Sequence, residues 1–455
     1  MKKLSPTLAL AAVFVAACSQ LSSRSVPLNA SVPSAPLPLL VRNSRVLDWP
    51  SKGNSPGLEE LDRIIGDAQI VMLGEPWHGD GAAIRLRSEI VAHLHEKLGF
   101  DVLVFESDFF GVARGWEKAA RTRDVGNFSK DDVYPFWAIT PAASPLWDHI
   151  GASLRRGSPL DIAGIDPKHV GADSRRDLPI FMDSLLSART TVSGTDRVHF
   201  RQILTKHLAN DEYRPDSSEA RFFYSALDAA QESLDLLLTD RASFAMQEVR
   251  NLRASADYAW RGGSRDRAMG DNLAWLATQR YPGRRIIVWA HNNHIAMSKW
   301  MYFAAPDTAI KRSVERRSVA SNGRFTYMGV EAKNFFGPRI VSIATLSYAG
   351  RYSPDVRTNV DTVLGRFEEG NFDSLATLVP APAGTVEAAL ANAGFALGVV
   401  NLRPLRATGA AISARVFDYT VSPPYAMRYW EGYDAFLFIR STFGLNESVW
   451  RTPRP

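Results

Sequence analysis

The chain has only one cysteine in 455 residues, and that residue, Cys18, lies near the amino terminus. A single cysteine cannot form a disulfide within the chain. It also leaves the main body without thiolate metal ligands and without a cysteine nucleophile. Catalysis by that body would therefore rest on other side chains.

Several motifs of common enzyme classes are also missing. The sequence contains no GxxxxGK phosphate loop, no GxGxxG dinucleotide fingerprint and no HExxH zinc motif. Its one GxSxG match, at 53–57, follows no predicted strand, and a serine nucleophile elbow requires a strand, a sharp turn and a helix. These absences argue against nucleotide binding, zincin chemistry and a serine triad.

The excess of positive charge is small. Lysine and arginine number 53 against 48 acidic residues, which gives a formal charge of +5, or +3 once Lys2 and Lys3 are removed. No basic run interleaved with aromatic residues is present. We therefore expect no nucleic-acid partner.

One hydrophobic run stands apart, Leu8 to Ala17, and it is too short to span a bilayer. It follows two lysines and ends in the sequence VAAC at 15–18, which resembles a lipobox. We expect residues 1–17 to be a lipoprotein signal peptide and the Cys18 thiol to carry lipid. Ser19 then favours an outer-membrane lipoprotein that faces the periplasm. An ordinary signal peptide with an incidental cysteine is the alternative.

Short apolar strands that end at polar residues recur along the chain. Strands are predicted at 69–73, 101–105, 160–165 and 285–290, and the polar residues that follow them are Glu75 and His78, Glu106, Asp166, and His291 with His294. The first two strands flank a predicted helix and form a βαβ unit, so both strands end at one edge of a parallel sheet. Ligands commonly bind at that edge. We expect five of these side chains to lie near one another: Glu75, His78, Glu106, His291 and His294.

The predicted fold is α/β, with a largely parallel central sheet, flanking helices and a substantial helical insertion over the active-site edge. An irregular segment at 300–326, which contains Arg312, Arg316 and Arg317, is expected to form a flap near the site. The predicted division of the chain is a Pro- and Ser-rich tether at 18–57, a first part of the core at 58–172, the insertion at 173–275 and a second part of the core at 276–445.

The predicted cluster combines imidazoles with carboxylates. A histidine held by a carboxylate can deprotonate water, and cationic neighbours can stabilise the oxyanion that forms at an ester carbonyl. Arg87, nine residues after His78, could supply such a cation. The same three histidines and two glutamates could instead bind a divalent metal ion, so that alternative stays open.

Several segments together resemble the erythromycin esterase family. They are LGEPWHG with its spacing to Arg87, VLVFESDF, SRDRAMGDNLAWL and VWAHNNHI. They follow the family order from about Leu58 to the last predicted strand. The resemblance implies an α/β fold with a large helical part. It also implies hydrolysis of a carboxylic ester, in known members a macrolide lactone, by an activated water.

The resemblance also implies roles for single residues. The family's proposed general base matches His78, and its two motif glutamates match Glu75 and Glu106. Its motif arginine matches Arg87, and its pair of active-site histidines matches His291 and His294. Arg265 and Asp266 match a further motif that could bind substrate or support the structure. Trp77 departs from the small residues usual at its position, and it could stack on a substrate or pack beneath the loop.

We therefore predict a lipid-anchored envelope hydrolase that acts on a small-molecule ester or lactone and needs no cofactor. A haem- or metal-binding envelope lipoprotein, a metal-dependent hydrolase of the same superfamily and an enzyme that tailors envelope polysaccharide are the alternatives. Resistance esterases of the family act in the cytoplasm, so the expected signal does not favour drug inactivation as the native role. The sequence leaves the oligomeric state open.

Overall fold

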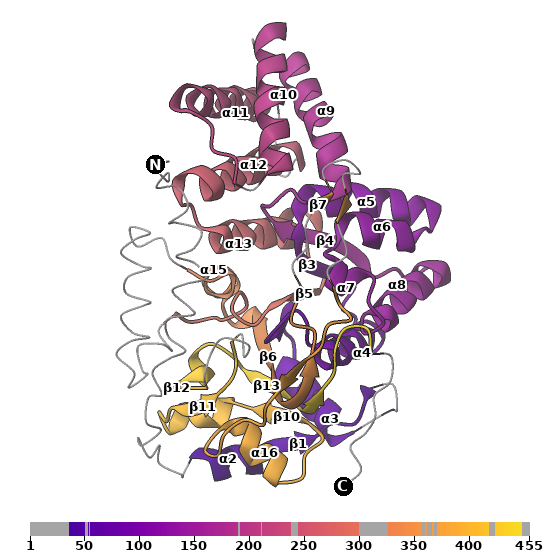
Figure 1. Ribbon diagram of the computed structural model, residues 1–455, viewed down its shortest axis with the longest axis vertical. Coiled ribbons are helices and arrows are strands. Elements are labelled where there is room, and N and C mark those ends of the chain that lie inside the picture. Colours follow the sequence, from indigo (N-terminus) through magenta and orange to yellow (C-terminus); the bar gives the residue numbers. More distant parts are fainter. Residues whose placement is uncertain are drawn as a thin grey trace, which may run out of the picture.

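A computed structural model describes residues 36–50, 53, 55–189, 192–210, 212–237, 244–299, 326–356, 360–361, 366–367, 371–417 and 424–447 (Figure 1). Cys18 and the signal peptide lie outside these ranges, so the lipid anchor stays a prediction. The arginines of the expected flap, Arg312, Arg316 and Arg317, lie outside them as well. No helix within the described ranges is long and apolar enough to cross a membrane.

A mixed, mostly parallel sheet forms the centre of the protein. Its strands follow the order β1-β10-β13-β6-β2-β5-β3-β4, and β9 pairs with the end of β6. The pairs from β13 to β4 are parallel, whereas β1, β10 and β9 join antiparallel. The strands of this sheet are β1 (Ser44–Val46), β2 (Ile70–Glu75), β3 (Val102–Asp108), β4 (Asp161–Asp166), β5 (Ile286–His291), β6 (Ile340–Tyr352), β9 (Ala376–Leu378), β10 (Leu397–Asn401) and β13 (Ala435–Thr442). Two small hairpins pair β7 (Val360–Asp361) with β8 (Arg366–Phe367) and β11 (Ile412–Ala414) with β12 (Tyr425–Met427).

Helices cover both faces of the sheet, and their ends carry recognisable sequence signals. Helix α4 begins after Asp80, whose carboxylate accepts from the Ala83 amide at 2.9 Å, and it ends at Gly99, which has a left-handed backbone. The helices are α2 (Pro36–Arg42), α3 (Pro56–Ile65), α4 (Gly81–Leu98), α5 (Phe109–Thr122), α6 (Val125–Asp132), α7 (Pro135–Ala138), α8 (Ser144–Arg156), α9 (Ala172–Arg189), α10 (Gly194–Ala209), α11 (Ser217–Leu237), α12 (Phe244–Arg261), α13 (Arg265–Trp275), α15 (Met328–Phe336) and α16 (Val386–Asn392). Short helical turns lie at Leu276–Arg280, Gly337–Arg339, Arg403–Ala407 and Tyr429–Glu431.

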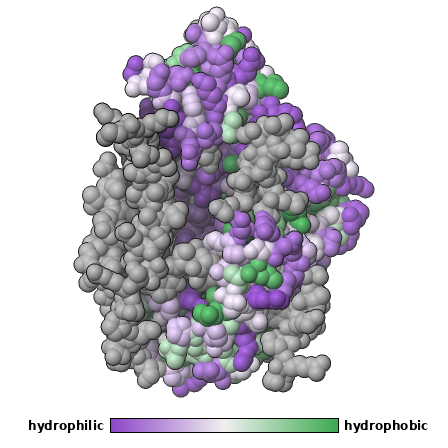
Figure 2. Space-filling view, in the orientation of Figure 1, coloured by the Kyte–Doolittle hydropathy of each residue, from purple (hydrophilic) through white to green (hydrophobic). Residues whose placement is uncertain are grey.

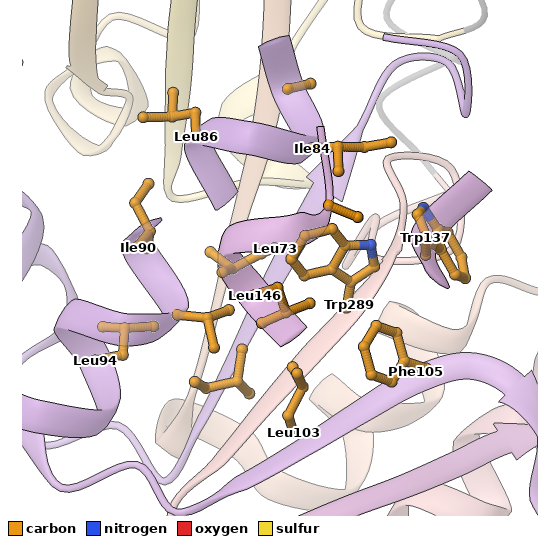
Figure 3. Packing of buried hydrophobic residues seen from close by; sticks show 14 of the residues in the cluster. Leu73, Ile84, Leu86, Ile90, Leu94, Leu103, Phe105, Trp137, Leu146 and Trp289 are labelled. Atoms are coloured by element: carbon orange, nitrogen blue, oxygen red, sulfur yellow. The ribbon is translucent and has the colours of Figure 1, made fainter. Parts of the chain in front are cut away.

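The sheet separates two apolar cores. Along β2, Ile70 and Met72 face the core beneath α13 and α15, while Val71 and Leu73 face the core beneath α4 and α8. This alternation follows from the two-residue period of a strand, and burial on both faces explains why these strands read as continuous apolar runs. Figure 3 shows the second core, where the α4 side chains pack toward Leu73 and Trp289.

The helical insertion has a core of its own. Helices α9 to α12 gather around a buried cluster that includes Phe200, Phe223 and Leu227. Figure 1 shows them projecting beyond the β4 edge of the sheet, while α13 returns the chain to the sheet. Between Ala172 and Trp275 every described regular element is a helix. The predicted α/β fold with a large helical insertion is therefore confirmed.

One local prediction was wrong. The tether was expected to extend to residue 57, but α2 and β1 lie within it, and β1 pairs with β10 at the edge of the sheet. Strand β1 is a short element that depends on pairing with the distant strand β10, which local composition does not reveal.

Candidate active site

The carboxyl ends of four neighbouring strands bring the predicted side chains to one edge of the sheet. Glu75 ends β2, His291 ends β5, and the two residues lie opposite each other in the parallel register. Glu106 lies in β3, and Asp166 ends β4. The expectation that parallel strands gather these groups is met by the geometry of the sheet.

Glycines allow the chain to turn tightly at this edge. A Cβ atom at Gly74 would lie 2.3 Å from the Asn292 amide oxygen, and one at Gly79 would lie 1.9 Å from the Ser353 carbonyl oxygen. The Asn292 side chain in turn bonds the backbone of Thr345 and Val416. Close backbone approach at these two glycines therefore fixes the end of β2, which carries Glu75, and the following loop, which carries His78.

Glu75 and His78 form a buried carboxylate–imidazole pair. His78 Nδ1 lies 2.7 Å from Glu75 Oε1, and Glu75 is fully buried whereas the His78 side chain is 25% exposed. Trp137 Nε1 donates to the same carboxylate oxygen at 2.9 Å. Because Nδ1 donates to Glu75, the lone pair of the neutral imidazole is on Nε2.

Arg87 holds the other oxygen of Glu75 from inside the core. Its guanidinium forms an ion pair with Glu75 Oε2, and both side chains are 0% exposed. It also contacts the backbone carbonyls of Leu73 and Ala290 and lies over the Trp289 ring, 3.9 Å from its centroid. Burial lowers the pKa of Arg87 well below its ordinary value, although the negative charge of Glu106 acts to raise it. A side chain so placed orients Glu75 and does not reach a substrate.

Aromatic rings enclose the His78 imidazole. Phe136 stacks on it with centroids 4.6 Å apart, and Trp137 meets it edge-on at 5.4 Å. The His291 ring lies 5.4 Å from it, and the His294 ring lies 6.5 Å beyond His291. The three imidazoles therefore form a row from Glu75 toward the second charged group of the site.

That second group is centred on Glu106 and Arg265. Glu106 Oε1 accepts from Arg265 Nη2 at 2.9 Å and lies 3.1 Å from His294 Nε2, while Oε2 accepts from the His291 amide at 2.9 Å. Arg265 also pairs with Asp166 through Nε, at 2.9 Å, and through Nη2. Arg265 and Asp266 lie at the start of α13, so the insertion delivers its charges directly to the sheet edge.

Neighbouring opposite charges determine the protonation states of His294 and Glu106. Burial would lower the pKa of His294, but Asp266 and Glu106 raise it to about 10. Burial likewise opposes ionisation of Glu106, yet His294 and Arg265 hold its pKa well below the ordinary value. His294 is therefore an imidazolium at neutral pH, and its two N–H groups point to Asp266 at 2.7 Å and to Glu106.

His291 is neutral and engaged by the backbone. Its Nδ1 accepts from the Asn293 amide at 3.1 Å, so Nε2 carries the hydrogen and donates to the Pro76 carbonyl at 2.9 Å. Burial, together with the nearby His78 and His294, lowers its pKa to about 3. His291 thus supports the loop rather than serving as a base.

The remaining predicted residues have structural contacts. Trp77 Nε1 donates to the Ser353 carbonyl at 2.9 Å, so this indole packs along the loop while remaining partly exposed. Asp266 accepts from the Met328 amide at 2.9 Å as well as from His294.

On the face drawn in Figure 2, the described surface is hollowed near its centre, below the helical insertion, and is mostly hydrophilic there. Within the described ranges, no group of three or more His, Cys, Asp or Glu side chains is arranged to hold a metal ion.

Comparison with known proteins now bears on this geometry. The model of the erythromycin esterase family matches residues 95–442, which is most of the chain. The chain belongs to the erythromycin esterase family. This confirms the resemblance that the sequence motifs indicate, and membership supports a hydrolase.

The relatives are remote in sequence. Erythromycin esterase type II of Escherichia coli is 24% identical over 383 residues, which cover 77% of this chain and 84% of that protein. The putative hydrolase YbfO of Bacillus subtilis is 22% identical over 281 residues, or 56% of this chain, and the match spans only 62% of YbfO. The activity of either relative is therefore carried over only as a proposal.

Solved structures share the fold. A succinoglycan biosynthesis protein aligns with a TM-score of 0.62 at 16% identity, covering 89% of this chain and 96% of that one. A mutant of the erythromycin esterase EreC in its open conformation aligns with a TM-score of 0.59 at 16% identity, covering 90% of this chain and all of the other. At this identity the likeness shows the fold alone.

Sequence reasoning missed Trp137 and Phe136 and did not select Asp166 for the site. Both aromatic residues come from the segment around α7, which has no motif and follows no predicted strand. The only local signal is its density of aromatic residues, which equally suits a core. Asp166 did carry a signal, because it ends a strand as Glu75 and His291 do.

The neutral state of His291 has a consequence for acid stability. Its folded pKa of about 3 lies below the unfolded value near 6.5, so its contribution is fully present above pH 6.5 and is lost as the pH falls toward 3. In His291→Gln, the free energy of unfolding should fall less steeply between pH 6.5 and 4.5, by about 1.4 kcal/mol per pH unit. Urea unfolding at several pH values measures this slope. An equal slope in both proteins would contradict the neutral assignment.

Proposed function

We propose that this protein hydrolyses a carboxylic ester or lactone of a small molecule, with a water activated by His78. The observation that carries the proposal is the Glu75–His78 pair, whose partly exposed imidazole lies in a row with a fixed imidazolium. In the first step His78 Nε2 accepts a proton from water while the oxygen adds to the carbonyl carbon. In the second step the C–O bond breaks, and the same proton passes from His78 to the leaving alkoxide.

Arg265 is the cation that we assign to the developing oxyanion, in place of the buried Arg87. Its Nε and Nη2 atoms are committed to Asp166 and Glu106. Among the described residues, the only polar contact of Nη1 is His294 Nε2 at 3.4 Å, and that nitrogen is itself a donor in the imidazolium. Nη1 is thus a preorganised donor on a side chain that is 19% exposed.

This assignment gives the remaining residues supporting roles. Glu106 and Asp166 balance the charge of Arg265 and fix its plane. Asp266 holds His294, and Arg87 orients Glu75. Trp77 and Phe136 flank His78, and the partly exposed Trp77 offers apolar surface to a substrate beside the base.

The experiment is turnover of a panel of lactones and simple esters by the purified protein, with and without chelator. We expect hydrolysis that resists the chelator, and a kcat about 100-fold lower in Arg265→Gln, since one lost oxyanion donor costs roughly that much. Arg267→Gln, two residues along α13 and 51% exposed, should match wild type. No turnover of any ester, together with a Soret band or a stoichiometric metal, would instead support a binding lipoprotein.

A further inference from the structure

Trp137 is buried and contacts both members of the Glu75–His78 pair. Its Nε1–H donates at 2.9 Å to Glu75 Oε1, the same oxygen that lies 2.7 Å from His78 Nδ1. Trp137 and Glu75 are both fully buried. One buried carboxylate oxygen is therefore shared by the Trp137 indole N–H and the Nδ1–H of His78.

The indole is held firmly in this position. Trp147 Nε1 donates to the Trp137 carbonyl at 2.7 Å, and the Trp137 ring packs against Phe105 and Trp289. Figure 3 shows the Trp137 and Trp289 rings side by side in the core above Phe105. Because Phe136, the preceding residue, stacks on the imidazole, one short segment contacts both members of the pair.

We propose that Trp137 is a positioning residue that sets the basicity and the orientation of His78 through Glu75. The inference rests on the proposed function and adds to it a residue that lies 62 positions from Glu75 in the chain. The indole N–H draws charge from Oε1 and leaves that oxygen one well-defined direction in which to accept from His78.

The loss of this N–H should shift the pH profile in a predictable direction. Oε1 becomes more basic when it loses a neutral donor, so it stabilises the protonated imidazole more strongly. The acid limb of the pH profile of kcat/KM should therefore move toward higher pH, by about half a unit. Loss of orientation should lower kcat about tenfold, with KM within about twofold of wild type.

Trp137→Phe tests this, with Trp116→Phe as the matched control. Trp116 is a buried tryptophan of the same core whose Nε1 also donates to a carboxylate, that of Asp161, at 3.1 Å. The control loses an equivalent hydrogen bond far from the site and should keep the wild-type profile. An unshifted limb in Trp137→Phe, or an equal shift in the control, would overturn the proposal.

A second variant guards against poor folding. Benzothienylalanine at position 137 keeps the shape of the indole and replaces only its N–H with sulfur, so the same shift is expected in a protein with an intact core. If wild type hydrolyses no ester, the proposed function fails separately. In that case the role of Trp137 is tested by the titration midpoint of the His78 imidazole, which NMR can follow. The His78 signal is identified by its loss in His78→Ala. An unchanged midpoint in the benzothienylalanine protein would refute the role of Trp137.

Discussion

His78→Ala is expected to lower kcat about 1000-fold on any ester that the wild-type protein hydrolyses, with KM changed by less than about threefold. The loss is large because no other imidazole at the site can take over. His291 has both ring nitrogens engaged with the backbone, and His294 is an imidazolium held between Asp266 and Glu106. Steady-state kinetics across pH 5 to 9 measures the loss.

The control is His93→Ala. His93 lies on α4 and pairs with Asp62 at 2.8 Å, outside the cluster, so its loss should leave kcat unchanged. Added imidazole should restore part of the activity of His78→Ala, because a small base can occupy the space left by the side chain. Retention of more than a tenth of wild-type activity in His78→Ala would show that another group activates the water.

The three histidines of the site show how far sequence reasoning extends. Their positions at strand ends predict that they converge, because parallel strands end at a common edge. Their roles depend instead on individual hydrogen-bond partners, such as the Pro76 carbonyl for His291 and the Asp266 carboxylate for His294. Those partners make one ring neutral and the other cationic, and nothing in the HNNH motif distinguishes them.

The two arginines illustrate the same limit. Arg87 lies in the motif and was expected to polarise the carbonyl, yet the inward face of α4 buries it completely. The sequence did not decide whether Arg265 binds substrate or supports the structure. Its place at the start of α13 brings it to the sheet edge beside Glu106. Spacing in sequence gives a helix face only approximately, and the packing of α4 on the sheet decides which cation reaches the surface.

Among the strands, long apolar runs were predictable and short paired ones were not. Strands β2 and β5 are fully buried, and both were expected within a residue or two of their observed ends. By contrast, β1 has three residues, two of them exposed, and it exists because β10 pairs with it. Its sequence lies in a Pro- and Ser-rich stretch that composition alone assigns to a tether.

The second large effect is expected on stability, from Arg87→Leu. This substitution leaves the Glu75 carboxylate buried without its ion-pair partner, and breaking such a pair typically costs about 3–5 kcal/mol. Activity should fall as well, because Glu75 then gains a proton and no longer orients His78. Urea unfolding at pH 7 measures the free energy, and Arg85→Leu is the matched control. Arg85 lies on the same helix, 38% exposed, and its pair with Glu89 should contribute less than about 1 kcal/mol.

The double variant Arg87→Leu with Glu75→Gln separates the two consequences of losing the pair. It removes the uncompensated charge, and the leucine packs against Trp289, so most of the lost stability should return. Activity should not return, because the amide oxygen can accept from His78 Nδ1 but carries no charge to stabilise the imidazolium that forms when His78 takes a proton. If Arg87→Leu proved as stable as Arg85→Leu, Glu75 would already be protonated in the folded protein. A double variant with wild-type turnover would remove Glu75 from the mechanism, because His78 would then act as a base without a carboxylate behind it.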